Sequence, residues 1–218
     1  MTCMKVMDCT NHSLNMVFKE LKAERPIIIP TDTNYNLACL PDSKKSIDLI
    51  FEYKERDKNK PLSLFFLNPN DWEKYGYTKN TNLIKLVVKE FWPGALNIIV
   101  ENKTNYDYML NGSDTIALGC IKNPVWRKFM QYIDSPIAIT SANISGTADE
   151  MLITEDVAMS QMGDKVNFLL KNNVQINATK SSTIISLVKA NKIEIIREGD
   201  ITKEHLNDVI KREGYEIE

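Results

Sequence analysis

The sequence lacks the standard elements of several common enzyme and binding-protein classes. Among its 218 residues there are only two histidines, His12 and His205, and four cysteines that form no Cys-x-x-Cys pair. A catalytic histidine relay, a zinc site and a disulfide framework are therefore not expected, and the cysteine usage fits a reducing compartment. Neither G-x-x-x-x-G-K-[S/T] nor G-x-G-x-x-G occurs. A nucleotide therefore needs a site other than these glycine-rich loops.

Long apolar runs and a strong charge imbalance are also missing. No stretch approaches the roughly 18 apolar residues of a membrane span, so we expect a cytoplasmic protein with no membrane partner. The chain carries 27 Lys and Arg against 29 Asp and Glu, which gives a formal net charge of -2. No overall basic field is therefore available to attract nucleic acid, and any site for a polyanion has to be local.

The sequence does contain an alternation of helical and strand patterns. Periodicity and capping residues predict helices behind Ser13, from Ser43 to about Arg56, over Leu83–Phe91 and Pro124–Ile133, from Thr154 to Gly163, and from Thr202 to about Arg212. Strands are predicted at residues 26–30, 61–67, 95–100, 115–121, 136–140 and 166–170, with a hairpin of 182–188 and 193–197. This pattern predicts one α/β domain of α+β character over residues 1–218, with a twisted mixed sheet flanked by helices.

Four polar clusters interrupt the apolar pattern, each beside the end of a predicted element, and open α/β sheets tend to place ligands at strand ends. They are Thr31–Tyr35, the basic segment Lys54–Lys60, the loop Thr140–Gly146, and Ser181–Thr183 together with Arg197. Each alone is also typical of a turn, a solvated helix end or an ordinary strand. Together, lysine and arginine side chains, hydroxyls and exposed backbone N–H groups are suited to a polyphosphate or a carboxylate.

The order and spacing of these segments are more specific than any one of them. PTDTNYNLACLPDS, KERDKNKPLSL, FWPGALNIIV, TIALGCIKNP, PIAITSANISG, SSTIIS and IIREGDI occur in this order between about residues 13 and 202. They resemble the successive motifs of the YrdC family of threonylcarbamoyl-AMP synthases. The resemblance implies a single-domain YrdC-like fold with a concave basic cavity.

The resemblance also implies an activity. A member of this family is a nucleotidyltransferase that makes threonylcarbamoyl-AMP and pyrophosphate from L-threonine, bicarbonate and ATP, for threonylcarbamoyladenosine formation in tRNA. Its expected partners are these three substrates and, downstream, tRNA or the tRNA-modification proteins that receive the adenylate. Mg²⁺ is expected to arrive with ATP and to have no dedicated protein ligands.

Site residues follow from the resemblance position by position. It implies that Lys54 and Arg56 are catalytic and that Thr33, Ser141 and Ser182 bind threonine. The residues expected to bind the nucleotide are Arg56, Lys60, Thr115, Asn143 and Arg197. Lys54 is expected to line the same cavity, and no residue is assigned to a metal.

The chain departs from the family pattern at Gly119, where the family usually has an arginine that contacts the carboxylate of threonine. Losing that contact weakens threonine binding roughly ten- to a hundredfold unless Lys122 or another cation replaces it. If the site otherwise follows the family pattern, we expect Gly119→Arg to tighten threonine binding. Two alternatives stay open: an enzyme that adenylates a different carbamate, and a non-catalytic protein that binds RNA or a nucleotide.

Overall fold

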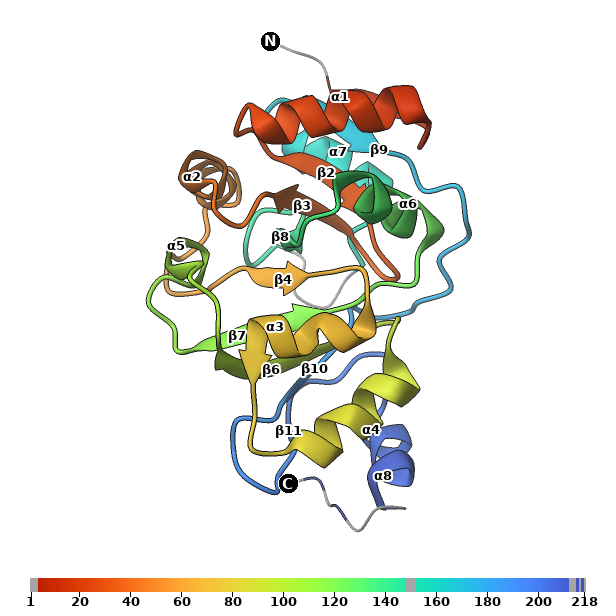
Figure 1. Ribbon diagram of the computed structural model, residues 1–218. Coiled ribbons are helices and arrows are strands. Elements are labelled where there is room, and N and C mark those ends of the chain that lie inside the picture. Colours follow the sequence, from red (N-terminus) through yellow and green to blue (C-terminus); the bar gives the residue numbers. More distant parts are fainter. Residues whose placement is uncertain (1–3, 148–151, 212–214, 216, 218) are drawn as a thin grey trace.

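A computed structural model describes residues 4–147, 152–211, 215 and 217, and its strands form one sheet through the middle of the molecule (Figure 1). The strands are β1 (Lys5–Met7), β2 (Ile27–Pro30), β3 (Tyr35–Cys39), β4 (Ser63–Phe65), β5 (Gly76–Tyr77), β6 (Leu96–Asn102), β7 (Thr115–Gly119), β8 (Ile137–Ser141), β9 (Phe168–Leu170), β10 (Thr183–Ser186) and β11 (Glu194–Arg197).

Helices of very different length surround this sheet. They are α1 (Asn11–Lys22), α2 (Lys44–Tyr53), α3 (Trp72–Tyr75), α4 (Thr81–Phe91), α5 (Asp107–Leu110), α6 (Pro124–Ile133), α7 (Glu155–Met162) and α8 (Lys203–Ile210), with a short 3-10 helix η1 (Pro69–Asp71) before α3. None of the helices in the described part of the chain is long and apolar enough to cross a membrane.

The sheet is mixed, as the sequence predicts. Its order is β1-β9-β2-β3-β8-β4-β7-β6-β10-β11, with β5 paired to β6 outside this path. The pairs β1/β9, β2/β9, β4/β7 and β6/β10 are parallel, and the remaining neighbours are antiparallel. The first and last strands, β1 and β11, therefore lie at opposite edges of the sheet, and the β4/β8 pair joins its two halves in the centre.

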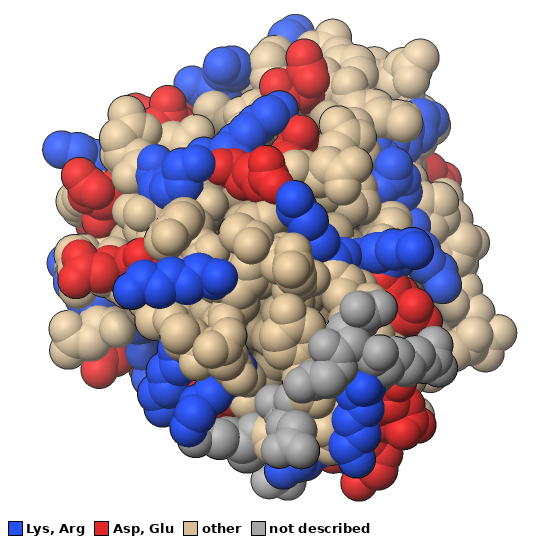
Figure 2. All heavy atoms as spheres, turned by 60° about the horizontal axis from the view of Figure 1, so that its bottom comes forward, with Lys and Arg blue, Asp and Glu red and all other residues tan. Residues whose placement is uncertain are grey.

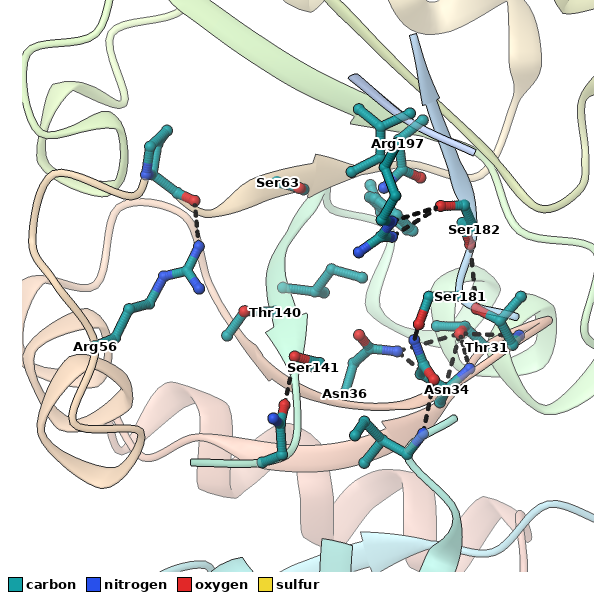
Figure 3. Close-up of a pocket in the computed structure, with 18 residues that line it drawn as sticks. Thr31, Asn34, Asn36, Arg56, Ser63, Thr140, Ser141, Ser181, Ser182 and Arg197 are labelled. Carbon is teal, nitrogen blue, oxygen red and sulfur yellow. Dashed lines mark hydrogen bonds between the residues drawn. The ribbon is translucent and has the colours of Figure 1, made fainter. Parts of the chain in front are cut away.

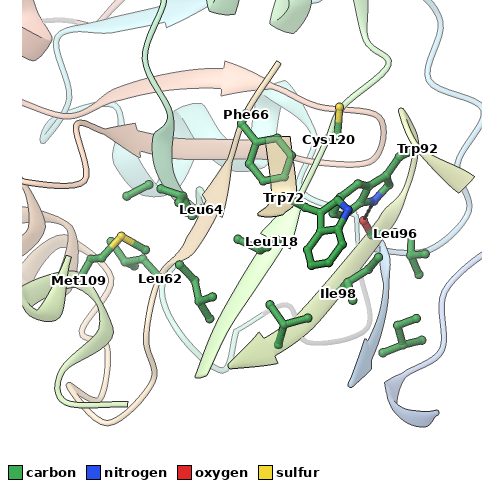
Figure 4. Packing of buried hydrophobic residues seen from close by; sticks show 14 of the residues in the cluster. Leu62, Leu64, Phe66, Trp72, Trp92, Leu96, Ile98, Met109, Leu118 and Cys120 are labelled. Carbon is green, nitrogen blue, oxygen red and sulfur yellow. Dashed lines mark hydrogen bonds between the residues drawn. The ribbon is translucent and has the colours of Figure 1, made fainter. Parts of the chain in front are cut away.

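Two hydrophobic clusters pack on opposite faces of this sheet, because successive strand residues point to opposite sides. On one face, Ile27 and Ile29 of β2 and Phe65 of β4 pack with α1 and α6, and the Phe65 and Trp126 rings meet edge to face. On the other face, α2, α4, α7 and α8 cover the larger cluster. Figure 4 shows part of this second cluster, in which Leu64 and Leu118 lie near Phe66 and Trp72.

The predicted elements are present with shifted ends, and several elements were missed. The hairpin of β10 and β11 is confirmed as an antiparallel pair, and β10 also pairs in parallel with β6, which the sequence pattern did not indicate. Strand β3 was not predicted: Tyr35 was placed in the polar cluster Thr31–Tyr35 and residues 36–39 were assigned to no element, although all five residues of the strand are buried. α8 ends at Ile210, and the expected helix end near Arg212 lies outside the described residues.

Asn123 is the N-cap residue of α6, and its side chain also contacts the loop after β2. Its Oδ1 accepts from the backbone N–H groups of Val125 and Trp126, and its Nδ2 donates to the Thr31 carbonyl at 3.1 Å. We predict that Asn123→Ala lowers the free energy of unfolding by about 1–3 kcal/mol, because helix cap and loop contact are lost together. Urea denaturation measures this loss. Asn70→Ala, at an exposed position of η1, serves as the control, and equal stability of the two variants would contradict the prediction.

Candidate functional site

A cavity of about 200 Å³ opens on the face of the sheet that also carries α1 and α6. Its floor is a row of side chains that neighbouring strands place opposite one another. The register pairs Asn36 with Ser141, Ile139 with Ser63, Phe65 with Gly119, Gly119 with Asn97, Asn97 with Ile184, and Ile184 with Arg197. Segments far apart in the sequence therefore contribute to one continuous surface.

Two arginines lie on opposite sides of this cavity (Figure 3). Arg56 follows α2, and its guanidinium donates to the carbonyls of Lys60 and Pro61 at 3.0 and 3.1 Å. Arg197, at the end of β11, donates twice to the Ser182 carbonyl, at 3.1 and 2.8 Å. These contacts hold both side chains in place with N–H groups left for a ligand, since a guanidinium has five.

Desolvation lowers the pKa of both guanidinium groups from their ordinary value. At Arg56 the nearby carboxylate of Asp57 acts in the opposite direction and raises the pKa, but desolvation has the larger effect. The Arg197 residue as a whole is exposed to solvent, but its guanidinium lies over the cavity. The desolvation therefore acts on the guanidinium group. Among the described residues that line the cavity there is no Asp or Glu. Two poorly hydrated cations in a cavity whose described lining has no acidic residue favour an anionic ligand.

Hydroxyl and carboxamide groups fill the wall between the arginines and come from the Thr31–Tyr35 loop and the start of β10. The Thr33 and Ser182 hydroxyls lie 3.1 Å apart, and both residues are buried. Asn34 donates to the Ser181 hydroxyl at 3.0 Å and accepts from the backbone N–H of Ile153 at 2.8 Å. These contacts join three separate segments and fix the orientation of the polar groups that face the ligand space.

Lys54 lies beneath the Ser141–Ser145 loop. The residue is 1% exposed, and its ammonium donates to the carbonyls of Ser141 and Asn143, the latter at 2.6 Å. The Lys54 carbonyl in turn accepts from the N–H of Ser145 at 2.8 Å. Lys54 is therefore a positioning residue for this loop, which differs from the expectation that its side chain lines the cavity.

The structure brings most of the predicted site residues together. Thr33, Arg56, Ser141, Asn143, Ser182 and Arg197 line the cavity. Lys60 is exposed on the loop after α2, and only its carbonyl contacts Arg56. Thr115 begins β7, four residues before Gly119, so it lies about 13 Å along the strand from the cavity floor. The cavity lining does not include three of the predicted site residues, Lys54, Lys60 and Thr115. Their contacts with a ligand stay predictions.

The environment of Gly119 explains why this position has no side chain. A Cβ atom built there would lie 2.5 Å from two ring carbons of Phe65, which lines the cavity and is 3% exposed. An arginine at this position therefore has to displace the Phe65 ring, which the sequence did not indicate, and the tighter threonine binding expected of Gly119→Arg stays a prediction. Lys122 does not replace the missing cation, because it lines a neighbouring hollow together with Asp32.

Three cavity residues on β4 and β6 were missed by the sequence analysis: Ser63, Phe65 and Asn97. Asn97 gave a usable signal, because it is the one polar residue in the otherwise apolar run ALNIIV. Ser63 and Phe65 gave none, since a strand alternates its faces without indicating which face meets a ligand.

The basic side chains of the segment after α2 do not gather on one exposed surface. Lys54 is buried and the guanidinium of Arg56 turns to the cavity, which leaves Lys58 and Lys60 beside Glu55 and Asp57. On the face shown in Figure 2, basic and acidic side chains are interspersed. The described residues also contain no group of three His, Cys, Asp or Glu side chains arranged to hold a metal ion.

A family model described as "Telomere recombination" and covering Sua5, YciO and YrdC proteins matches residues 19–199. The chain belongs to the Sua5/YciO/YrdC family. Among curated relatives, threonylcarbamoyl-AMP synthase of Psychromonas ingrahamii is 29% identical over 176 residues, which are 80% of this chain and 87% of that protein. The protein of the same name from Photorhabdus laumondii is 30% identical over 155 residues, 70% of this chain and 81% of its own.

Solved structures of the family share the fold. Sua5 of P. abyssi, crystallised with L-threonine, superposes with a TM-score of 0.83 at 21% identity and covers 98% of this chain. This chain spans only 61% of that protein's length. YciO of E. coli superposes with a TM-score of 0.76 at 17% identity, over 92% of this chain and 98% of its own. Both comparisons confirm the single mixed α/β architecture expected from the sequence.

Lys54 provides a test of the loop contact described above. We predict that Lys54→Met lowers the free energy of unfolding by roughly 3 kcal/mol, because two buried carbonyls lose their donor. Lys60→Met, at an exposed site in the same segment, should leave stability within about 0.5 kcal/mol of the parent protein. Urea denaturation distinguishes the two. A Lys54→Met protein as stable as the parent would show that the ammonium does not hold the loop.

The contact between Phe65 and Gly119 predicts a non-additive pair of substitutions. Gly119→Ala alone should destabilise the protein by about 1–3 kcal/mol, because its Cβ enters the space of the Phe65 ring. Phe65→Leu should relieve part of that cost, so the double variant is more stable than the sum of the two single changes indicates. A thermal-unfolding double-mutant cycle measures the coupling, and strict additivity would contradict the contact.

Proposed function

We propose that this chain is an L-threonylcarbamoyladenylate synthase, which forms threonylcarbamoyl-AMP and pyrophosphate from L-threonine, bicarbonate and ATP. The observation that carries the proposal is the cavity itself, in which Arg56 and Arg197 flank the hydroxyls of Thr33, Ser141 and Ser182. The names of the curated relatives support the reaction, and the threonine-bound Sua5 structure supports the amino acid.

The chemistry requires alignment and charge neutralisation and no covalent nucleophile from the protein. The threonine amine adds to bicarbonate with loss of water to give a carbamate, and a carbamate oxygen then attacks the α-phosphorus of ATP. The new O–P bond forms as the bond to the β-phosphate oxygen breaks, and pyrophosphate leaves with the electron pair. Holding both reactants in one cavity lowers the entropic cost of their meeting.

The residues of the cavity divide this work between them. Arg56 and Arg197 neutralise charge on the transferring phosphates, and their fixed hydrogen bonds keep them oriented before the ligand arrives. Thr33 and Ser182 hold the amino-acid part through their paired hydroxyls. Lys54 keeps Ser141 and Asn143 in position from below. Mg²⁺ that accompanies ATP would add charge neutralisation at the phosphates, and its ligands would be phosphate oxygens and water.

One observation favours a second candidate within the same chemistry. Gly119 and the Phe65 ring give the cavity floor a shape and charge that differ from the family pattern, so the carbamate of another amino acid is the alternative substrate. The tRNA that receives the threonylcarbamoyl group, and the proteins that transfer it, belong to the same proposal as downstream partners.

We predict that the purified chain releases pyrophosphate from ATP only when bicarbonate and L-threonine are both present, with a threonylcarbamoyl-AMP mass in the product. Arg56→Gln should lower the rate by about ten- to a hundredfold, the effect of one charge-assisted hydrogen bond. Lys58→Gln, exposed two residues away, should leave it unchanged. A threonine-independent rate, or equal rates for the two variants, would count against the proposal. A higher rate with another amino acid would select the second candidate.

A further inference from the structure

Asn97 is a buried polar residue whose side chain has no hydrogen-bond partner among the residues that the structure describes. The residue is 9% exposed, lines the cavity, and its Oδ1 is fully enclosed without a hydrogen bond. Its Nδ2 makes no hydrogen bond among the described residues either. Because only the oxygen of the carboxamide is fully enclosed, the amide nitrogen is the end that faces the cavity. An apolar side chain of the same shape would avoid the unpaired oxygen, so stability does not explain an asparagine here.

The neighbours of Asn97 leave its amide accessible to a ligand. Asn97 lines the cavity, and it lies opposite Gly119 on one side, where the Phe65 ring occupies the space of a side chain, and opposite Ile184 of β10 on the other. Ser182 lies two residues before Ile184 on the same face, and Arg197 is opposite Ile184 on β11. The amide therefore belongs to the end of the cavity that also holds the Ser182 hydroxyl and the Arg197 guanidinium.

We propose that the Nδ2 amide of Asn97 binds the carboxylate of the amino-acid substrate. This inference rests on the proposed function and deepens it. The amide N–H groups of Asn97 can only donate hydrogen bonds. The Ser182 hydroxyl and the Arg197 guanidinium beside them are also donors, and the described lining has no acidic residue, so this end of the cavity favours a ligand group that only accepts hydrogen bonds. A carboxylate fits beside the paired hydroxyls of Ser182 and Thr33, where the amino acid is placed above. Asn97 is then a specificity-determining residue that selects a free carboxylate over a neutral amide.

The test is Asn97→Leu, which keeps the side-chain shape and removes the donor. We expect the KM for L-threonine at saturating ATP to rise by about tenfold, while the KM for ATP changes less than twofold. The parent protein should prefer L-threonine to L-threoninamide, and Asn97→Leu should reduce that preference. The melting temperature should stay the same or rise, because an unpaired buried oxygen is removed; a purely structural role predicts that it falls.

Two further variants complete the design. Asn97→Asp keeps the shape and replaces the donor with a negative charge, so its KM for threonine should rise more than that of Asn97→Leu. Ser46→Ala removes another unpartnered buried oxygen, on α2 and outside the cavity, and should change neither KM.

The outcomes separate this inference from the proposed function. An active parent protein whose threonine KM is unaffected in both Asn97 variants overturns the role of Asn97 alone, as does an increase confined to ATP. A parent protein that releases no pyrophosphate with any amino acid overturns the proposed function and this inference with it.

Discussion

The register of the strands from β3 to β11 is the constraint on which the cavity depends. Because side chains alternate between the two faces of a strand, a slip of one residue would exchange the polar floor for the apolar face. The apolar clusters on both sides of the sheet prevent such a slip, since Leu64 and Leu118 are as firmly buried on one face as Phe65 is on the other. The hydrophobic core thus positions the functional groups that it does not itself contain.

The loops at the rim of the cavity are held by buried polar contacts. Lys54 fixes the Ser141–Ser145 loop from below, Asn34 joins the segment after β2 to Ile153, and Arg197 fixes the Ser182 carbonyl. In each case the partner is a backbone group, so the contact sets the course of the chain as well as the direction of one side chain. A cavity organised in this way needs little rearrangement to bind a ligand, which lowers the entropic cost of binding.

The sequence predicted most of the longer helices and strands and much of the candidate site, and it missed short elements, strand β3 and what depends on pairing between distant strands. Helices such as α6 carry their own signals, with Asn123 as cap and an apolar stripe behind it. The polar segments at the rim were recognised by composition and by their order. That Gly119 and Asn97 are cross-strand neighbours, or that Phe65 covers Gly119, follows only from the register. The burial of Lys54 was likewise invisible, because a lysine at a helix end is usually solvated.

The central claim is that one cavity holds a nucleotide and an amino acid together between Arg56 and Arg197. A crystal structure with L-threonine and a non-hydrolysable ATP analogue tests it most directly. The account predicts phosphate density against the two guanidinium groups and the amino acid beside Thr33, Ser182 and Asn97. Both ligands bound elsewhere on the molecule, or a nucleotide that fills the place of the amino acid, would contradict it.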